Sequence, residues 1–368
     1  MAKVSFSNKG QEFFISLKKS VDQYFTDNSI KKTGDWRLFI KAFIFIPLAI
    51  AIYFFLLYGS YPAVAGMLLS VVFGIVLSCI AFNVMHDANH GSFSSKKWVN
   101  ELMGYTMNIL GSDAFIWKMK HNILHHTYTN VDGLDDDMTK SPILRMSPTQ
   151  RWVPAHRFQY IYMFLIYSVS TILWVFLTDM AKYFTRKIIV TEMKLTAKEH
   201  IIFWVSKVFY VAVYMVIPAV VLGWQTWLVG YLILNITMGI TFAFVFQTAH
   251  IVEITEFEKA GDTPKVIGDE WAIHELKTTA NFAMKNKVIS WLVGGLNFQV
   301  EHHLFTRISH VHYPAISKIV QEHCAKFNVP YLYFNTMTGA VLSHIRLMKQ
   351  LGNEVLPVKN MGRGELAA

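Results

Sequence analysis

The sequence HDANH at residues 86–90 directly follows a long apolar run, so two histidines lie at the polar edge of a hydrophobic segment. Two further clusters have the same character: HNILHH at residues 121–126 and QVEHH at residues 299–303. Together the clusters hold seven imidazoles and one glutamine amide, from three distant parts of the chain. Imidazole-rich sites suit iron, zinc, copper or nickel. We therefore expect a metal site at a membrane face, large enough for two metals, with oxidative chemistry and a lipid substrate.

The composition is typical of an integral membrane protein. Of the 368 residues, 53% are hydrophobic and 16% are charged, and the mean hydropathy is +0.32. Soluble domains are usually about a quarter charged. The polar N-terminus has no apolar core of the signal-peptide type, so no cleaved signal is expected. Neither Cys79 nor Cys324 lies in a ligand-like cluster, so we do not expect cysteine to ligate a metal here.

Four segments are long and apolar enough to cross about 30 Å of hydrocarbon: residues 42–58, 61–82, 201–222 and 226–249. They form two hairpins whose short links contain no Lys or Arg. Because positive charge collects on the cytoplasmic side, we place the hairpin tips outside and both termini in the cytosol. Lys207 is the exception inside a span, and we expect its side chain to snorkel toward the interface.

A fifth apolar stretch, residues 158–177, also looks like a span by hydropathy. If it crossed the membrane, the third histidine cluster would face the opposite side from the first two. A crossing would also place the basic residues that follow it outside. We therefore expect this stretch, like residues 98–117, to lie in the interface or to dip in without crossing.

These arguments predict an all-α integral membrane protein with four transmembrane helices in two hairpins and a cytosolic helical cap that holds the metal site. No linker or repeat divides the chain, so one domain over residues 1–368 is expected. Its parts are a cytosolic N-terminal segment (1–41), a first hairpin (42–82), a cytosolic and interfacial part (83–200), a second hairpin (201–249) and a cytosolic C-terminal part (250–368).

Helical spacing predicts how the histidines meet. Residues i and i+4 share one helix face, so His86 and His90 can reach one metal, and His121 and His125 repeat that geometry. The adjacent residues in each of the pairs 125–126 and 302–303 can address two metals. His250 ends the fourth span at the predicted cytosolic boundary and is a further candidate ligand, the alternative being an interfacial histidine that faces headgroups.

Polar residues near the clusters are candidates to support the ligands. Metal-bound imidazoles commonly donate their second N–H to a carboxylate or carbonyl. Asp87 and Glu301 are such candidates, as is the acidic run at residues 135–137, for which a solvated loop is the alternative. Gln299 lies one turn before His303 and can supply an amide oxygen or hold a water.

The sequence resembles the membrane fatty acid desaturase family, most closely its front-end (carboxyl-directed, Δ6-type) members. The matching text is HDANHGSFS, KHNILHHTYTN, TAHIVE, WAIHELKTTANF and GGLNFQVEHHLFTRISHVHYP, which runs from about the first span to residue 312. The resemblance implies a di-iron enzyme that uses O2 and two external electrons to introduce a cis double bond into a fatty acyl chain. The front-end signature is Gln299, where other members have a histidine, and it implies a bond on the carboxyl side of an existing one.

By this resemblance eight histidines look like the iron ligands: His86, His90, His121, His125, His126, His250, His302 and His303. No catalytic residue beyond the metal centre is implied. Some relatives place a contributing Asn four residues before the additional histidine of the fourth span, but this chain has Phe246 there. Gln247 or Asn281 can take its place, and the alternative for Asn281 is that it supports the ligands without binding the metal.

No HPGG haem motif, Rossmann fingerprint or P-loop occurs in the sequence. We therefore expect no bound haem or flavin, and a separate ferredoxin or cytochrome b5 as electron donor. The acyl carrier, CoA or a glycerolipid, stays open. A bacterial inner membrane is favoured, or the endoplasmic reticulum in a eukaryote.

Two other functions remain for comparison. A lipid hydroxylase could use the same scaffold and oxidant. A metal transporter would need ionisable residues along its spans, and only Lys207 qualifies. The formal net charge of +9 reflects the basic cytosolic face and attraction to anionic lipids, and no nucleic-acid motif is present.

Overall fold

The bundle of long helices follows from capping and apolar composition. The computed structural model describes residues 4–354 except 9, 140, 141, 190 and 262. Asp35 caps the first long helix by accepting from the Arg37 backbone N–H at 2.9 Å, as N-cap carboxylates do. Five helices in the described part are long and apolar enough to cross a membrane: Trp36–Tyr58, Ala63–Asn89, Pro154–Thr185, Ala197–Leu222 and Trp224–His250.

Two of these five helices are single elements, and three are composed of two labelled α-helices each. They are α2 (Trp36–Tyr58); α3 (Ala63–Ile80) with α4 (His86–Asn89); α9 (Gln159–Leu173) with α10 (Asp179–Thr185); α11 (Ala197–Val211) with α12 (Ile217–Leu222); and α13 (Trp224–His250). Each of the three composite apolar helices contains a π-helical turn: Ala81–Met85, Trp174–Thr178 and Ala212–Val216. Such turns are rare and occur mostly at functional sites.

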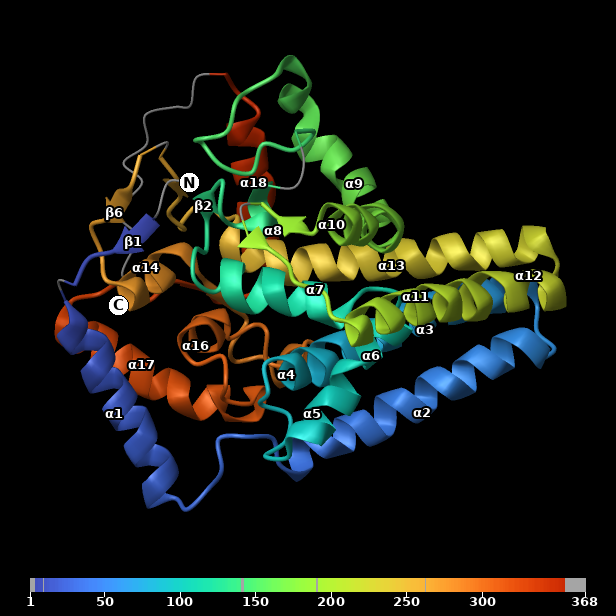
Figure 1. The fold of residues 1–368 in the computed structure, drawn as a ribbon, viewed down its shortest axis with the longest axis horizontal. Coiled ribbons are helices and arrows are strands. Elements are labelled where there is room, and N and C mark those ends of the chain that lie inside the picture. Colours follow the sequence, from blue (N-terminus) through green and yellow to red (C-terminus); the bar gives the residue numbers. More distant parts are fainter. Residues whose placement is uncertain (1–3, 9, 140–141, 190, 262, 355–368) are drawn as a thin grey trace.

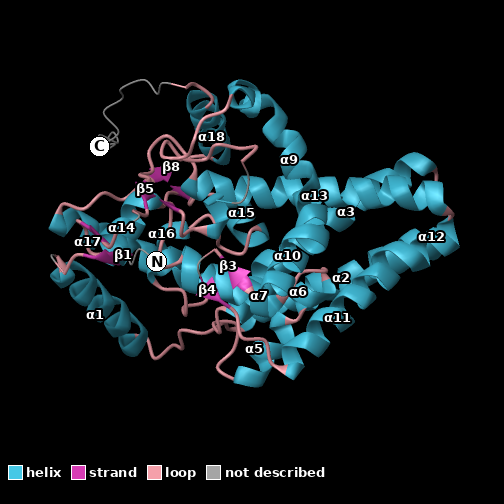
Figure 2. Cartoon of the chain, turned by 45° about the horizontal axis from the view of Figure 1, so that its top comes forward, coloured by secondary structure: helices cyan, strands magenta, loops and turns pink. Residues whose placement is uncertain are grey.

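The arrangement separates the helices into two kinds. In Figures 1 and 2, α2, α3, α11–α12 and α13 run along the long axis of the molecule, and the links between them lie at one end. The helix over Pro154–Thr185 instead runs across α13. Gly239 permits this close crossing, because a Cβ at that position would clash with the carbonyl oxygen of Tyr167.

The other end of the bundle carries the remaining elements, which we call the head. Its helices are α1 (Gln11–Asp27), α5 (Lys97–Gly104), α6 (Thr106–Ile109), α7 (Ala114–Lys118), α8 (Asp136–Thr139), α14 (Trp271–Thr278), α15 (Lys287–Leu292), α16 (Gln299–Leu304), α17 (Tyr313–Phe327) and α18 (Met337–Leu351). A π-helical stretch covers Met119–His125, and 3-10 turns cover Pro154–Phe158 and His310–His312.

Four short two-stranded ladders tie the head together. The parallel pairs are β1 (Val4–Phe6) with β6 (Lys265–Ile267), β2 (Val131–Asp132) with β5 (Glu258–Lys259), and β7 (Asn281–Phe282) with β8 (Tyr333–Phe334); β3 (Lys187–Ile188) and β4 (Thr191–Glu192) pair antiparallel. Each parallel pair joins segments distant in sequence, so the ladders fix the loops of the head around its centre.

Helix α1 shows how sequence pattern becomes packing in the head. Its buried residues Phe13, Leu17, Val21 and Phe25 recur every four positions and form one apolar stripe, as expected for a helix with one buried face. The stripe packs on α17.

The described part of the chain is mostly helical, as the sequence predicts. Five of its helices, one more than the four predicted spans, are long and apolar enough to cross a membrane. Residues 98–117 form three short helices, each too short to cross a bilayer. The predicted terminal segments include residues 1–3 and 355–368, which lie outside the described residues.

Lys207 does not snorkel, contrary to the expectation from sequence. Its side chain is only 8% exposed. The ammonium lies 3.2 Å from Asp179 Oδ2 and donates to the carbonyls of Gly111 and Val175 at 2.6 and 2.9 Å. The prediction failed because Asp179 comes from another helix, and only the fold shows that an acidic partner is near.

This buried pair should stabilise the fold. We expect Lys207→Met to lower the free energy of unfolding by about 3–5 kcal/mol, because it leaves the Asp179 carboxylate buried without its cation. Thermal unfolding of the detergent-solubilised chain measures this as a lower midpoint. Lys198→Met is the control, because Lys198 is an exposed partner of Glu101, and its midpoint should not move. Equal midpoints for both variants would contradict a structural role for the pair.

Candidate metal centre

All eight predicted histidines converge at the junction of the bundle and the head. His86 and His90 come from the end of the second apolar helix and His250 is the last residue of α13. His121 and His125 lie on the π-helical stretch before His126, and His302 and His303 lie on α16. All eight side chains are buried.

The histidines form groups with metal-site spacing. In one group, His86, His90, His121 and His302 each offer a ring nitrogen, and these atoms lie within 4.8 Å of one another. A second group of the same tightness contains His125, His250 and His303. His126 joins the two, because it groups with His302 and His303 and its Nε2 lies 3.1 Å from Nε2 of His121.

The ring nitrogens that face the centre fit a metal. Within the described residues, Nε2 of His86, His90, His302 and His303 and Nδ1 of His126 are buried without a hydrogen-bond partner. Buried polar atoms are normally paired, so five unpaired imidazole nitrogens in one cluster fit residues that ligate a metal. A donor set made of imidazole suits iron, copper, nickel or zinc.

The opposite ring nitrogens are held by neighbours that orient the rings. Nδ1 of His125 lies 3.1 Å from both carboxylate oxygens of Asp135. Nδ1 of His303 donates to Glu275 Oε2 at 2.7 Å. Nδ1 of His302 lies 3.1 Å from the hydroxyl of Tyr313. These contacts hold Nδ1 of each ring on the outer side and leave Nε2 for a metal, which is the usual arrangement of supporting residues.

Electrostatics favour neutral rings. Burial, and then the neighbouring imidazoles, hold the pKa values of His121, His126, His302 and His303 well below the usual range. Metals bind the neutral imidazole. Burial alone would lower the pKa of His125 as well, but the Asp135 carboxylate raises it, which makes this ring a stronger donor.

The other predicted residues lie around the cluster in different roles. Asp87 accepts from the Ser309 hydroxyl at 2.7 Å and lies 3.0 Å from Nδ1 of His310, while its distance to Nδ1 of His86 is 3.9 Å. Asp135 is buried against His125 and is therefore not part of a solvated loop. Gln299 is buried, and its Nε2 has no partner within the described part of the chain.

Glu301 and Asn281 support the third cluster from behind. Glu301 accepts from Tyr331 at 2.7 Å and from Asn281 at 2.9 Å, and burial raises its pKa to about 7. The side-chain oxygen Oδ1 of Asn281 accepts from the backbone N–H of Val300 in the first turn of α16 at 2.9 Å. Asn281 therefore anchors the helix that carries His302 and His303.

Sequence reasoning missed three supporting residues: Glu275, Thr129 and Tyr313. Thr129 donates to Glu275 at 2.8 Å and lies 3.2 Å from His303 Nδ1. The carboxylate in WAIHEL, residues 271–276, was a possible signal. It was overlooked because the segment lies far from every histidine cluster in sequence.

A cavity of about 300 Å³ adjoins the histidines. His121, His125 and His250 line one part of it, together with the polar groups of Lys120 and Asp137. Apolar residues of α9 and α13, with Met138, Leu144 and Met146, line much of the rest. A largely apolar space beside a candidate metal pair suits an alkyl chain.

Comparison with known proteins agrees with this geometry. The fatty acid desaturase family profile matches residues 60–335. The chain is 33% identical to a sn-1 linoleoyl-lipid 6-desaturase of Arthrospira platensis, over 95% of both chains. It is 34% identical to the enzyme of that name from Synechocystis sp., over 95% of this chain and 98% of the other. An acyl-lipid (8-3)-desaturase of Physcomitrium patens is 32% identical over 94% of this chain and 72% of its own.

The Glu275 contact predicts a measurable effect on metal affinity. Glu275→Ala removes the acceptor that orients His303, and loss of such a partner typically costs about 10- to 100-fold in affinity. We expect the variant to lose its bound metal at correspondingly lower chelator concentration. Glu275→Gln keeps an acceptor oxygen and should fall between. Glu322→Ala, exposed on α17, is the control, and identical chelator curves for Glu275→Ala and the control would refute the supporting role.

Proposed function

Because the chain belongs to the fatty acid desaturase family, it desaturates fatty acyl chains, and we propose that it does so with a pair of irons held by the eight buried histidines. The observation that carries this proposal is the convergence of those histidines, with unpaired ring nitrogens, beside an apolar cavity. In our assignment, one iron is bound by His86, His90, His121 and His302. The second is bound by His125, His250 and His303, and His126 lies between them.

The reaction removes two hydrogens from adjacent methylenes, and with two electrons and two protons reduces O2 to two waters. A bound iron pair supplies the oxidising power needed to break an unactivated C–H bond. The protein's residues position the acyl chain and exclude water from the site. The apolar walls of the cavity exclude water, and Trp117, whose ring stacks on His121 at 4.3 Å, shields the histidines.

We propose that the substrate is a linoleoyl-type chain on a glycerolipid, desaturated on the carboxyl side of its existing double bonds. The support is the similarity to two linoleoyl-lipid 6-desaturases over almost the whole of both chains. The two electrons come, in this proposal, from a separate ferredoxin or cytochrome b5. Hydroxylation by the same scaffold is not favoured, because the matched relatives named above are desaturases.

In the membrane, we propose four spans in two hairpins, with the head, both termini and the metal pair in the cytosol of a bacterial inner membrane. The helix over Pro154–Thr185 is the fifth that could span by length and composition. Its course across α13, rather than along it, supports a position in the interface (Figure 1). This arrangement leaves all three histidine clusters on one side.

The proposed reaction can be tested from the acyl product. A host fed linoleate and expressing this chain should gain an acyl product with a new double bond on the carboxyl side of the existing ones, located by mass spectrometry of derivatised chains. His302→Ala should abolish the product, because an assigned ligand is lost. His323→Ala, a histidine that contacts Ser20 instead, should retain it. A hydroxylated product, or a product unaffected by His302→Ala, would overturn the proposal.

The proposed number of spans can be tested by cysteine labelling. Ser60→Cys in the first hairpin link should react with a membrane-impermeant maleimide in intact spheroplasts. Lys194→Cys, exposed after α10, should react only once the membrane is permeabilised. The native cysteines are buried and serve as the background in unmodified chains. Labelling of Lys194→Cys from outside would show that Pro154–Thr185 crosses the membrane.

A further inference from the structure

A second, smaller cavity lies deeper in the bundle than the one beside the histidines. Its volume is about 40 Å³, and Leu77, Ala81, Met85 and Met238 are among the residues that line it. Met85 directly precedes His86 in sequence, and the inner cavity borders both the helix over Ala63–Asn89 and α13. We call the cavity beside the histidines the outer cavity.

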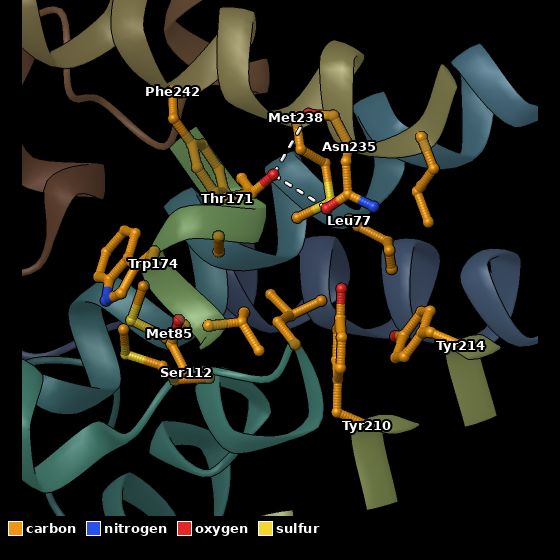
Figure 3. A pocket seen from close by; sticks show the side chains of 15 residues that line it. Leu77, Met85, Ser112, Thr171, Trp174, Tyr210, Tyr214, Asn235, Met238 and Phe242 are labelled. Carbon is orange, nitrogen blue, oxygen red and sulfur yellow. Dashed lines mark hydrogen bonds between the residues drawn. The ribbon is translucent and has the colours of Figure 1, made fainter. Parts of the chain in front are cut away.

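The two cavities have two lining residues in common, Trp174 and Phe242. Both stand on one side of the inner cavity, with Tyr210 and Tyr214 on the other (Figure 3). Trp174 and Phe242 therefore stand where the two cavities adjoin, on the way that an acyl chain would take from the outer cavity to the inner one.

Trp174 is held rigidly from two directions. Its indole N–H donates to Asp179 Oδ1 at 3.0 Å, and that carboxylate is itself fixed by Lys207. The ammonium of Lys120 lies 4.8 Å from the centre of the indole ring and pairs with Asp137 at 2.6 Å. Trp174 also begins a π-helical turn. Phe242 is held on the other side by Phe82, at a ring distance of 5.3 Å.

The inner cavity, by contrast, can adapt to what enters it. Met85, Met107 and Met238 line it, and flexible methionine side chains repack easily. Two of the polar side chains there satisfy each other: Thr171 donates to Asn235 Oδ1 at 2.9 Å, as Figure 3 shows. The walls are apolar and yielding, so a space of about 40 Å³ can widen to admit a hydrocarbon tail, while the entrance is rigid.

We infer that Trp174 and Phe242 grip the acyl chain between the metal centre and its methyl-terminal tail, and so fix which methylene is oxidised. Orientation of the substrate decides which bond reacts, and the rigid point nearest the reacting carbon controls that orientation. Asp179 and Lys120 are then positioning residues for Trp174. The inference rests on the proposed desaturase function.

The test is the position of the new double bond in linoleate-fed cells that express the full chain. Trp174→Leu and Phe242→Leu widen the grip from opposite sides. We expect each to lower the ratio of the main positional isomer to all others about tenfold or more, because apolar contacts of this size discriminate about 10- to 200-fold. Trp174→Phe keeps an aromatic ring and should lie between. Trp224→Leu, which alters a 64% exposed tryptophan at the second hairpin link, should not change the ratio.

The outcomes separate this inference from the proposed function. If the wild type makes the double bond and both leucine variants make it with the wild-type isomer ratio, the grip is wrong and the desaturase assignment stands. If the wild type makes no double bond, the proposed function fails and takes the inference with it. Iron content and membrane abundance are measured for every variant, and Phe242→Leu decides the question if Trp174→Leu does not accumulate.

Discussion

Everything in this structure depends on keeping imidazole nitrogens buried and unpaired at one point. Five such nitrogens, on His86, His90, His126, His302 and His303, have no partner among the described residues. Each buried, unsatisfied polar group costs about 1–3 kcal/mol. Five of them together cost as much as the whole net stability of a typical domain, about 5–15 kcal/mol. The fold is therefore consistent with a centre that bound metals stabilise, and the rings are arranged as ligands rather than as packing.

The rest of the protein can be understood as support for that centre. The helix over Ala63–Asn89 and helix α13 bring His86 and His250 together, and the head closes over them with His302 and His303 on a helix anchored by Asn281. Asp135, Glu275 and Tyr313 hold the outer ring nitrogens. The same bundle also forms the cavities for a hydrocarbon chain, so the helices that position the histidines also line the path of the substrate.

Much of this was readable from the sequence. Local patterns carried these predictions: the i, i+4 spacing of His121 and His125, and the apolar runs. Such patterns depend only on residues close in sequence, so they can be recognised before the fold is known. What could not be read were contacts between distant segments. Lys207 looked like a snorkelling lysine because its partner Asp179 belongs to another helix. Glu275 looked ordinary because nothing near it in sequence marks it as a partner of His303. Asn281 was predicted to replace a missing ligand or to support the site, and its hydrogen bonds to Glu301 and Val300 favour support.

The central claim is that the eight histidines hold two irons in one coupled centre. The most direct measurement is Mössbauer spectroscopy of the full chain loaded with ⁵⁷Fe, combined with iron quantification per chain. The account predicts two irons per chain with nitrogen-rich ligation, and loss of signal from both when His126, which lies between the two groups, is replaced by alanine. One iron per chain, or stoichiometric zinc in an active preparation, would contradict it.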